Sequence, residues 1–247
     1  MEIMNLDKLP AEARKKIEPY ARGLLEVYGK EVISLFVYGS VTGLDFDPRT
    51  SDINIGVFLR DTSLDALKKS LGIVKKGIRK KINAPLFLTK EYLERSLDSF
   101  PVEFMEMKDS RCVLYGEDVL ETVAVKKQDL RVECESQIKG KLIVLKQAYL
   151  EQALNRKGLE KLIKEALKSL LPVFRNMLRI KRDAKPPTGK KEMLAMFGTE
   201  FGIDTGAFIK VLEDKKSDGK IGRGDAEDFL EDFTVQLGKL SLAVDKL

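Results

Sequence analysis

The amino-acid sequence predicts an α+β fold in which a small mixed-sheet domain is followed by an all-α helical bundle. In the first half of the chain, short apolar segments alternate with segments of helical pattern, which indicates a sheet flanked by helices. From Gln128 onwards no segment has the pattern of a strand, whereas apolar residues recur at helical spacing over long stretches. We therefore expect two domains, residues 1–122 and 123–247, with a boundary near 122–127.

The expected elements of the first half are recognised by composition and by the turn residues that bound them. Strands are expected where β-branched and aromatic residues form short runs between turn formers. Helices are expected where capping residues precede a helical pattern, as Ser63 and Thr89 do here. In chain order the prediction is helix 7–28, strand 31–39, strand 52–60, helix 64–81, strand 84–88, helix 90–97, and 102–116 as one bent strand or as two strands (102–108 and 111–116).

The second half shows three long amphipathic helices and two shorter ones, a pattern typical of a helical bundle. The second long helix contains Pro172, where we expect a kink. Thr188 and Asp204 are placed to cap the two shorter helices. The apolar stripes that define the three long helices run from Leu130 to Tyr149, from Leu159 to Leu178 and from Phe229 to Leu247.

Composition excludes several classes of chemistry. The chain has no histidine, so serine–histidine and cysteine–histidine nucleophiles, histidine-ligated zinc and a histidine general base are all excluded. The net charge of +5 is too small and too dispersed to indicate a nucleic-acid partner. Two cysteines without metal-like spacing, no signal-type N-terminus and no long apolar segment favour a cytoplasmic protein that does not enter a membrane.

One stretch, LFVYGSVTGLDFDPRTSDINIGVFL (35–59), carries the best candidate site. An apolar strand ends in Gly39-Ser40, eleven residues follow, and Asp52-Ile53-Asn54 leads into a second apolar strand. Residues spaced by two on a strand share a face, so Asp52 and Asn54 should point together toward the Gly-Ser turn. Glycine-turn N–H groups and a serine hydroxyl can bind phosphate oxygens, and carboxylates opposite the turn can hold Mg²⁺.

This arrangement resembles the DNA-polymerase-β-like nucleotidyltransferase superfamily, whose signature is a strand, Gly-Gly or Gly-Ser, a polar loop, and Asp-x-Asp or Asp-x-Glu in the next strand. A helical bundle after the catalytic domain is similar to the aminoglycoside-type and minimal nucleotidyltransferases. The resemblance implies that Gly39 and Ser40 bind a nucleoside triphosphate, with ATP as the first choice. It implies that Asp52, Asn54 and Glu103 hold Mg²⁺ (or Mn²⁺), that Asp52 and Glu103 are catalytic, and that the acceptor is a hydroxyl group.

The resemblance also implies a third carboxylate, on a later strand, that completes the metal site, and this sequence offers two candidates for it. Glu103 and Glu106 lie in a segment expected to be a strand, and residues three apart on a strand face opposite sides, so only one of them can serve. The resemblance favours Glu103. Asp45 and Asp47 could add a ligand, but their place in a turn-rich loop favours a capping role.

Asn54 is the departure from the family pattern, because it stands where the signature has a second carboxylate. An amide oxygen can bind Mg²⁺ but carries no charge. Two interpretations therefore remain open: a nucleotidyltransferase with an atypical Asp-x-Asn motif, or a catalytically degenerate protein that binds nucleotide or a partner protein. A homodimer, or the nucleotidyltransferase half of a two-protein pair, is compatible with either.

Two further segments each have a structural and a functional interpretation. Residues 214–225 partly parallel a calcium-binding loop, but Lys216 at a ligand position favours a glycine-rich connector. A basic run on one helix could steer a polyanion toward the site, although a solvated helix face is the simpler interpretation. That run consists of Lys75, Lys76, Arg79, Lys80 and Lys81.

Overall fold

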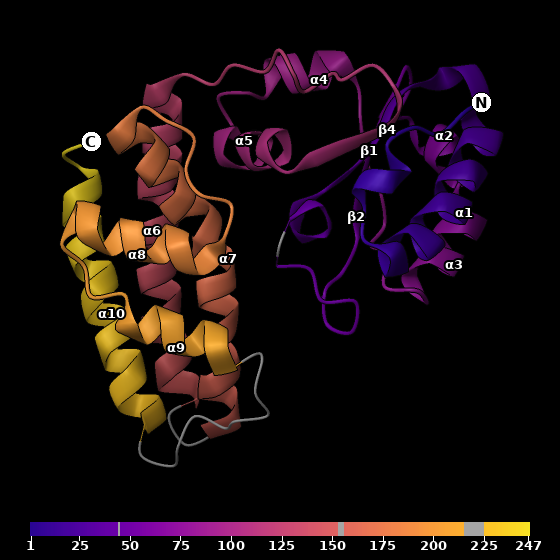
Figure 1. Cartoon of the computed structure of the whole chain (residues 1–247). Coiled ribbons are helices and arrows are strands. Elements are labelled where there is room, and N and C mark those ends of the chain that lie inside the picture. The colour runs from indigo at the N-terminus through magenta and orange to yellow at the C-terminus, as the bar shows by residue number, and fades with distance from the viewer. Residues whose placement is uncertain (44, 153–155, 215–224) are drawn as a thin grey trace. The chain divides into compact units, whose positions relative to one another are not determined.

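The computed structural model describes residues 1–43, 45–152, 156–214 and 225–247. Its sheet is mixed and has the strand order β3-β2-β1-β4 (Figure 1). Strand β1 pairs antiparallel with β2 and with β4, and β3 runs parallel to β2. This confirms the predicted mixed sheet. The strands are β1 Val32–Tyr38, β2 Asn54–Leu59, β3 Leu86–Leu88 and β4 Arg111–Gly116.

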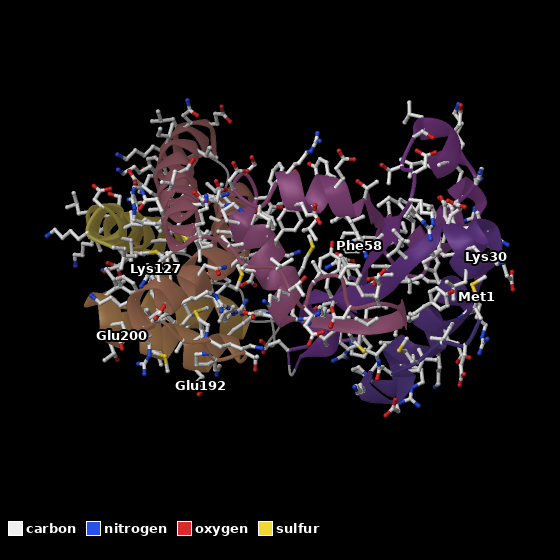
Figure 2. All side chains as sticks on the ribbon, turned by 90° about the horizontal axis from the view of Figure 1, so that it is seen from above. Met1, Lys30, Phe58, Lys127, Glu192 and Glu200 are labelled. Atoms are coloured by element: carbon white, nitrogen blue, oxygen red, sulfur yellow. The ribbon has the colours of Figure 1, made fainter. Side chains whose placement is uncertain are left out.

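Helices cover both faces of this sheet, so the two central strands are buried on both sides. That explains why β1 and β2 appear in the sequence as continuous apolar runs. The side chains of Leu35 and Val37 pack in one core cluster with residues of α1, whereas Phe36 and Phe58 pack in a second cluster with residues of α4 and α5. Figure 2 shows Phe58 inside this part of the protein and Lys30 at its surface. The helices here are α1 Ala11–Tyr28, α2 Leu64–Lys68, α3 Leu71–Ile78, α4 Lys90–Arg95 and α5 Pro101–Asp109, with short 3-10 turns at Leu6–Lys8, Gly29–Glu31 and Gly39–Thr42.

The expected strand over 102–108 is wrong, because this segment is helix α5. The segment is short and partly apolar, which is compatible with a strand, but its Glu, Met and Lys residues are strong helix formers. Pro101 stands at the start of the helix, where its missing N–H has no acceptor to lose. Only 111–116 of the expected 102–116 strand region is a strand, β4.

The expected helix over 64–81 is divided into α2 and α3. The division lies at Ser70, a buried residue whose hydroxyl donates to the carbonyl of Leu67 at 2.9 Å. The backbone N–H groups of Ile73 and Val74 then bond to the carbonyl of Ser70, which starts α3 in a new direction. A serine hydroxyl that competes for a backbone carbonyl is a common reason for such a break.

The chain divides into two compact units, Met1–Val125 and Lys126–Leu247. The described residues of the second unit contain helices and no strand, as expected. A group of aromatic rings forms part of its core. The ring of Phe174 is stacked with those of Phe197 and Phe208, with centroid distances of 4.5 and 5.5 Å, and the rings of Phe208 and Phe233 meet edge to face at 4.9 Å. The helices of this unit are α6 Lys127–Gln152, α7 Arg156–Arg182, α8 Lys190–Phe201, α9 Gly206–Asp214 and α10 Asp225–Val244.

Within the described residues, no helix combines the length and the apolar content that a membrane span requires. The segment compared with a calcium loop falls mainly on residues 215–224, which lie outside the described part of the chain.

Candidate functional site

The candidate site begins where β1 ends. Tyr38 is the last residue of β1, and Gly39–Thr42 forms a single 3-10 turn directly after it. Gly39 has a φ of +81°, a backbone conformation that side chains other than glycine's rarely adopt. Val41 is fully buried in the core cluster that contains Leu35, Val37 and residues of α1, and this anchors the turn. Gly39 and Ser40 stay half-buried. Burial also raises the pKa of the Tyr38 phenol, which therefore stays neutral.

Ser110 fixes this turn from the junction between α5 and β4. The N–H of Gly39 is shared between the carbonyl oxygen of Ser110 at 3.0 Å and its hydroxyl oxygen at 3.1 Å. The hydroxyl of Thr42 lies 2.8 Å from the same carbonyl and 2.9 Å from the carbonyl of Gly39. The backbone of the glycine turn is thus bonded to a second segment of the chain, far away in sequence.

The junction itself is held by an ion pair. Arg111 is the first residue of β4 and pairs with Tyr38 in the sheet. Its guanidinium makes two contacts of 2.6 Å to the two carboxylate oxygens of Asp118. Such two-point pairs are among the stronger charged contacts, and the Arg111 side chain is only 18% exposed. On the other side, the Ser110 hydroxyl donates to the carbonyl of Glu106 in α5 at 2.6 Å, so Ser110 is held from both α5 and β4.

Removing the Ser110 hydroxyl should loosen the turn. In Ser110→Ala the backbone carbonyl still accepts from Gly39, but the hydroxyl's hydrogen bonds with the Gly39 N–H and with the carbonyl of Glu106 are lost, so the expected loss is about 1–2 kcal/mol. Amide hydrogen exchange of residues 39–43 should accelerate by about tenfold. Ser99→Ala, at an exposed serine of the same unit, is the matched control. Equal exchange in both variants would show that Ser110 does not hold the turn.

Asn54 lies directly beside the glycine turn. It starts β2 and pairs with Tyr38 across the sheet. A methyl group built on Gly39 would come 3.3 Å from the Asn54 side-chain nitrogen. Asp52 precedes it by two residues and is exposed, whereas Asn54 is half-buried. The structure thus places the Asn54 side chain beside Gly39. Asp52 lies two residues before Asn54 in the segment that leads into β2.

Asn83 is the residue that sequence reasoning missed. Its side-chain N–H donates to the side-chain oxygen of Asn54 at 2.8 Å, and its backbone N–H donates to the carbonyl of Ile53 at 3.0 Å. Because β3 runs parallel to β2, the residues that precede the two strands meet at the same edge of the sheet. A polar residue shortly before the apolar run 84–88 was the available signal.

The two glutamates do not lie on a strand. Glu103 is in the first turn of α5 and is exposed, and Glu106 is half-buried one turn later. On a helix, residues three apart share a face, which corrects the expectation that the two face opposite sides. Counted along the helix axis at ~1.5 Å per residue, Glu106 is about 6 Å and Glu103 about 10 Å from Ser110.

The loop before β2 is organised by capping contacts. A carboxylate oxygen of Asp47 accepts from the backbone N–H of Arg49 at 2.8 Å, and the backbone N–H of Asp47 donates to the hydroxyl of Ser51 at 3.1 Å. The hydrogen bond from the Arg49 backbone holds the pKa of the Asp47 carboxyl below its usual range. Asp47 therefore serves as a loop cap.

The motif offers a metal ion one charged oxygen ligand, the carboxylate of Asp52, and one neutral oxygen ligand, the amide of Asn54. Among the described residues, no three His, Cys, Asp or Glu side chains gather in a way that could hold a metal. Asp52 is the carboxylate of the motif, and the Asn54 oxygen already accepts a hydrogen bond from Asn83. Mg²⁺ commonly needs only one or two protein carboxylates when substrate phosphates and water complete its shell.

Comparison with solved structures identifies the fold. The chain matches the crystal structure of spectinomycin adenyltransferase AAD(9) from Enterococcus faecialis, solved with ATP and spectinomycin, with a TM-score of 0.57. The match covers 91% of this chain and 98% of that chain, at 11% sequence identity. The protein has a nucleotidyltransferase-like α+β fold.

At this identity the likeness shows the nucleotidyltransferase-like fold and nothing about activity. A scan against protein-family models finds no match, and a search of curated proteins finds none either.

Proposed function

We propose that the first unit binds a nucleoside triphosphate, with ATP as the first choice, at the Gly39–Thr42 turn. The observation that carries this proposal is the fixed turn itself: Gly39 at a φ of +81°, bonded to Ser110 and placed against Asn54. A glycine backbone allows phosphate oxygens to approach where a side chain would block them. In the proposed complex, the Ser40 hydroxyl and the backbone N–H groups after Gly39 contact the phosphates.

In this proposal Asp52 contacts the Mg²⁺ (or Mn²⁺) that the nucleotide carries. The ion screens the phosphate charges when it is bound, and Asp52 supplies the protein's one charged ligand in the Asp-x-Asn motif. The Asn54–Asn83 amide pair replaces the second carboxylate with neutral groups. At 4 Å and an effective dielectric constant of 20, a missing unit charge opposite a divalent ion is worth roughly 8 kcal/mol before desolvation.

The electrostatics therefore favour binding over two-metal catalysis. A second metal ion is stabilised in such sites by carboxylates that bridge both ions. With one carboxylate in the motif, the proposed primary function is recognition of nucleotide, coupled to a partner or acceptor that the second unit binds.

Replacing Asp52 by asparagine tests the nucleotide site. Asp52→Asn should weaken binding of ATP in the presence of Mg²⁺ at least tenfold, about 1.4 kcal/mol, because the charged metal contact is lost. Binding of Mg²⁺-free ATP should not weaken, since a carboxylate only repels the bare triphosphate. Isothermal titration of both forms measures this, with Glu26→Gln, at an exposed glutamate of α1, as the matched control.

Two results would contradict the nucleotide site. One is the absence of binding of any nucleoside triphosphate by the unmodified protein, with and without Mg²⁺. The other is an equal change in Asp52→Asn and Glu26→Gln, which would mean that net charge alone sets the affinity.

A second candidate function is transfer of a nucleoside monophosphate from ATP to a hydroxyl acceptor. It is favoured by the likeness in fold to spectinomycin adenyltransferase, whose structure was solved with ATP and spectinomycin. The test is incubation with α-labelled ATP and panels of hydroxyl compounds and proteins. Label on an acceptor, lost in Asp52→Asn, would establish transfer and displace binding as the primary function.

A further inference from the structure

A basic hollow in the first unit suggests a second site that binds an anion. The hollow has a volume of about 580 Å³, within the usual range for small-ligand sites. It is lined from three separate segments: α1, the loop before β2, and the end of α3. Helices α1 and α3 lie side by side in this unit (Figure 1). The lining residues are Lys16, Pro48, Arg49, Arg79, Lys80 and Lys81.

The lining is cationic, and carboxylates outside it, Asp47 and Glu12, balance its positive charge only in part. Five of its six residues carry positive charge and none carries negative charge. Arg49 has one weak ion pair, 3.8 Å from Asp47. Within the described residues, Lys16, Arg79, Lys80 and Lys81 form no salt bridge. Five converging positive charges that are only partly balanced repel one another, so an anion bound among them would relieve that repulsion.

The backbone at Lys81 is an independent sign that this arrangement has a use. Lys81 lies in the turn that follows α3 and has a φ of +63°, a left-handed conformation that residues other than glycine and asparagine seldom adopt. A side chain other than glycine's costs roughly 1 kcal/mol or more in this conformation. The conformation directs the Lys81 ammonium to the carbonyl oxygen of Arg49, which ties the end of α3 to the loop before β2. Strain of this kind concentrates at functional sites.

The same segment reaches the candidate nucleotide site without being part of it. The carbonyl of Lys81 accepts from the N–H of Ile53, between Asp52 and Asn54. The basic side chains, however, line a hollow that contains neither the glycine turn nor any residue of the Asp-x-Asn motif.

The lining also limits the class of ligand. It contains no aromatic side chain on which a nucleobase could stack, so the hollow recognises charge rather than a base. Its cations are gathered in one concavity rather than along a strip, which suits a compact ligand better than an extended nucleic-acid strand. We propose that the hollow is a separate binding site for a compact oligophosphate, and this inference does not rest on the nucleotide site at Gly39.

The test compares two double variants that remove the same charge from the same helix region. Arg79→Gln/Lys80→Gln removes two cations from the hollow, and Lys75→Gln/Lys76→Gln removes two exposed cations of α3 that do not line it. Isothermal titration with inorganic tripolyphosphate, in Mg²⁺-free buffer, should show at least tenfold weaker binding in the first variant and less than threefold weakening in the second. Added NaCl should weaken binding to the unmodified protein, because exposed charges are screened.

Titration of the same proteins with ATP and Mg²⁺ separates the two sites. If the nucleotide proposal holds, a separate site predicts that both double variants bind this nucleotide alike; if that proposal fails, the tripolyphosphate titration alone tests the hollow. Equal tripolyphosphate binding in the two variants would overturn the inference, as would a parallel loss of nucleotide binding in Arg79→Gln/Lys80→Gln. Binding of a single-stranded oligonucleotide in place of tripolyphosphate would also overturn it, in favour of a nucleic-acid surface.

Discussion

Asn54→Asp is expected to create nucleotidyl transfer from ATP, or to raise it at least 100-fold above the unmodified protein. The substitution restores a second carboxylate two residues after Asp52, at the start of β2 and beside the glycine turn. A 100-fold change corresponds to about 2.7 kcal/mol of transition-state stabilisation. That is well below the roughly 8 kcal/mol that a unit charge contributes near a divalent ion before desolvation, so the expectation is conservative.

The local structure can accept this substitution. Asparagine and aspartate have nearly the same shape, and the side-chain N–H of Asn83 already donates to the Asn54 oxygen at 2.8 Å. A carboxylate at position 54 would keep that hydrogen bond, now as a charge-assisted one. Repulsion from Asp52 should destabilise the metal-free variant, and Mg²⁺ should reverse this as a rise in melting temperature.

The measurements are α-labelled transfer to hydroxyl acceptors and thermal unfolding with and without Mg²⁺. Asp52→Asn/Asn54→Asp is the matched control, because it keeps the net charge and moves the single carboxylate to the other position. It should show neither transfer nor the enlarged Mg²⁺ effect. If the unmodified protein already turns over and Asn54→Asp changes little, the interpretation as a weak or retired catalyst is wrong.

Local pattern was sufficient to predict much of the sheet. The apolar runs of β1 and β2 and the turn residues between them required no tertiary information, since strands buried on both faces read as continuous apolar segments. The φ of +81° at Gly39 likewise agrees with the turn expected at that position. What the sequence could not supply was the partner of the turn, because Ser110 is 71 residues away from Gly39.

The two errors have different physical causes, one local and one non-local. The sequence of 102–108 is compatible with a strand or a helix, and the helix propensity of Glu, Met and Lys together with Pro101 decides in favour of α5. The expected strand also placed Glu103 on the sheet. Asn83 was missed because its contact with Asn54 depends on the parallel pairing of β3 with β2, a non-local feature.

Gly56→Ala is expected to destabilise the first unit by about 3 kcal/mol or more, near the upper end of overpacking effects. Gly56 is in the centre of β2 and pairs with Phe36 of β1. A methyl group at Gly56 would lie 2.1 to 2.7 Å from three atoms of the Phe36 ring, distances that packed carbon atoms do not tolerate. The Phe36 ring is fully buried, and its centroid lies 5.8 Å from the ring centroids of both Phe58 and Tyr38. The ring therefore has little room to move.

Hydrogen exchange of β1 and β2 is the suitable measurement, because the chain has no tryptophan and divides into two units. A loss of 3 kcal/mol should accelerate globally protected amides there by about two orders of magnitude, while α6 and α7 serve as an internal reference. Gly72→Ala, at a helical glycine whose methyl group would meet nothing within 4 Å, should instead be neutral or stabilising. Phe36→Leu/Gly56→Ala should recover part of the loss, since a smaller side chain leaves room for the methyl group. Wild-type exchange in Gly56→Ala would mean that the ring of Phe36 does not lie over this glycine.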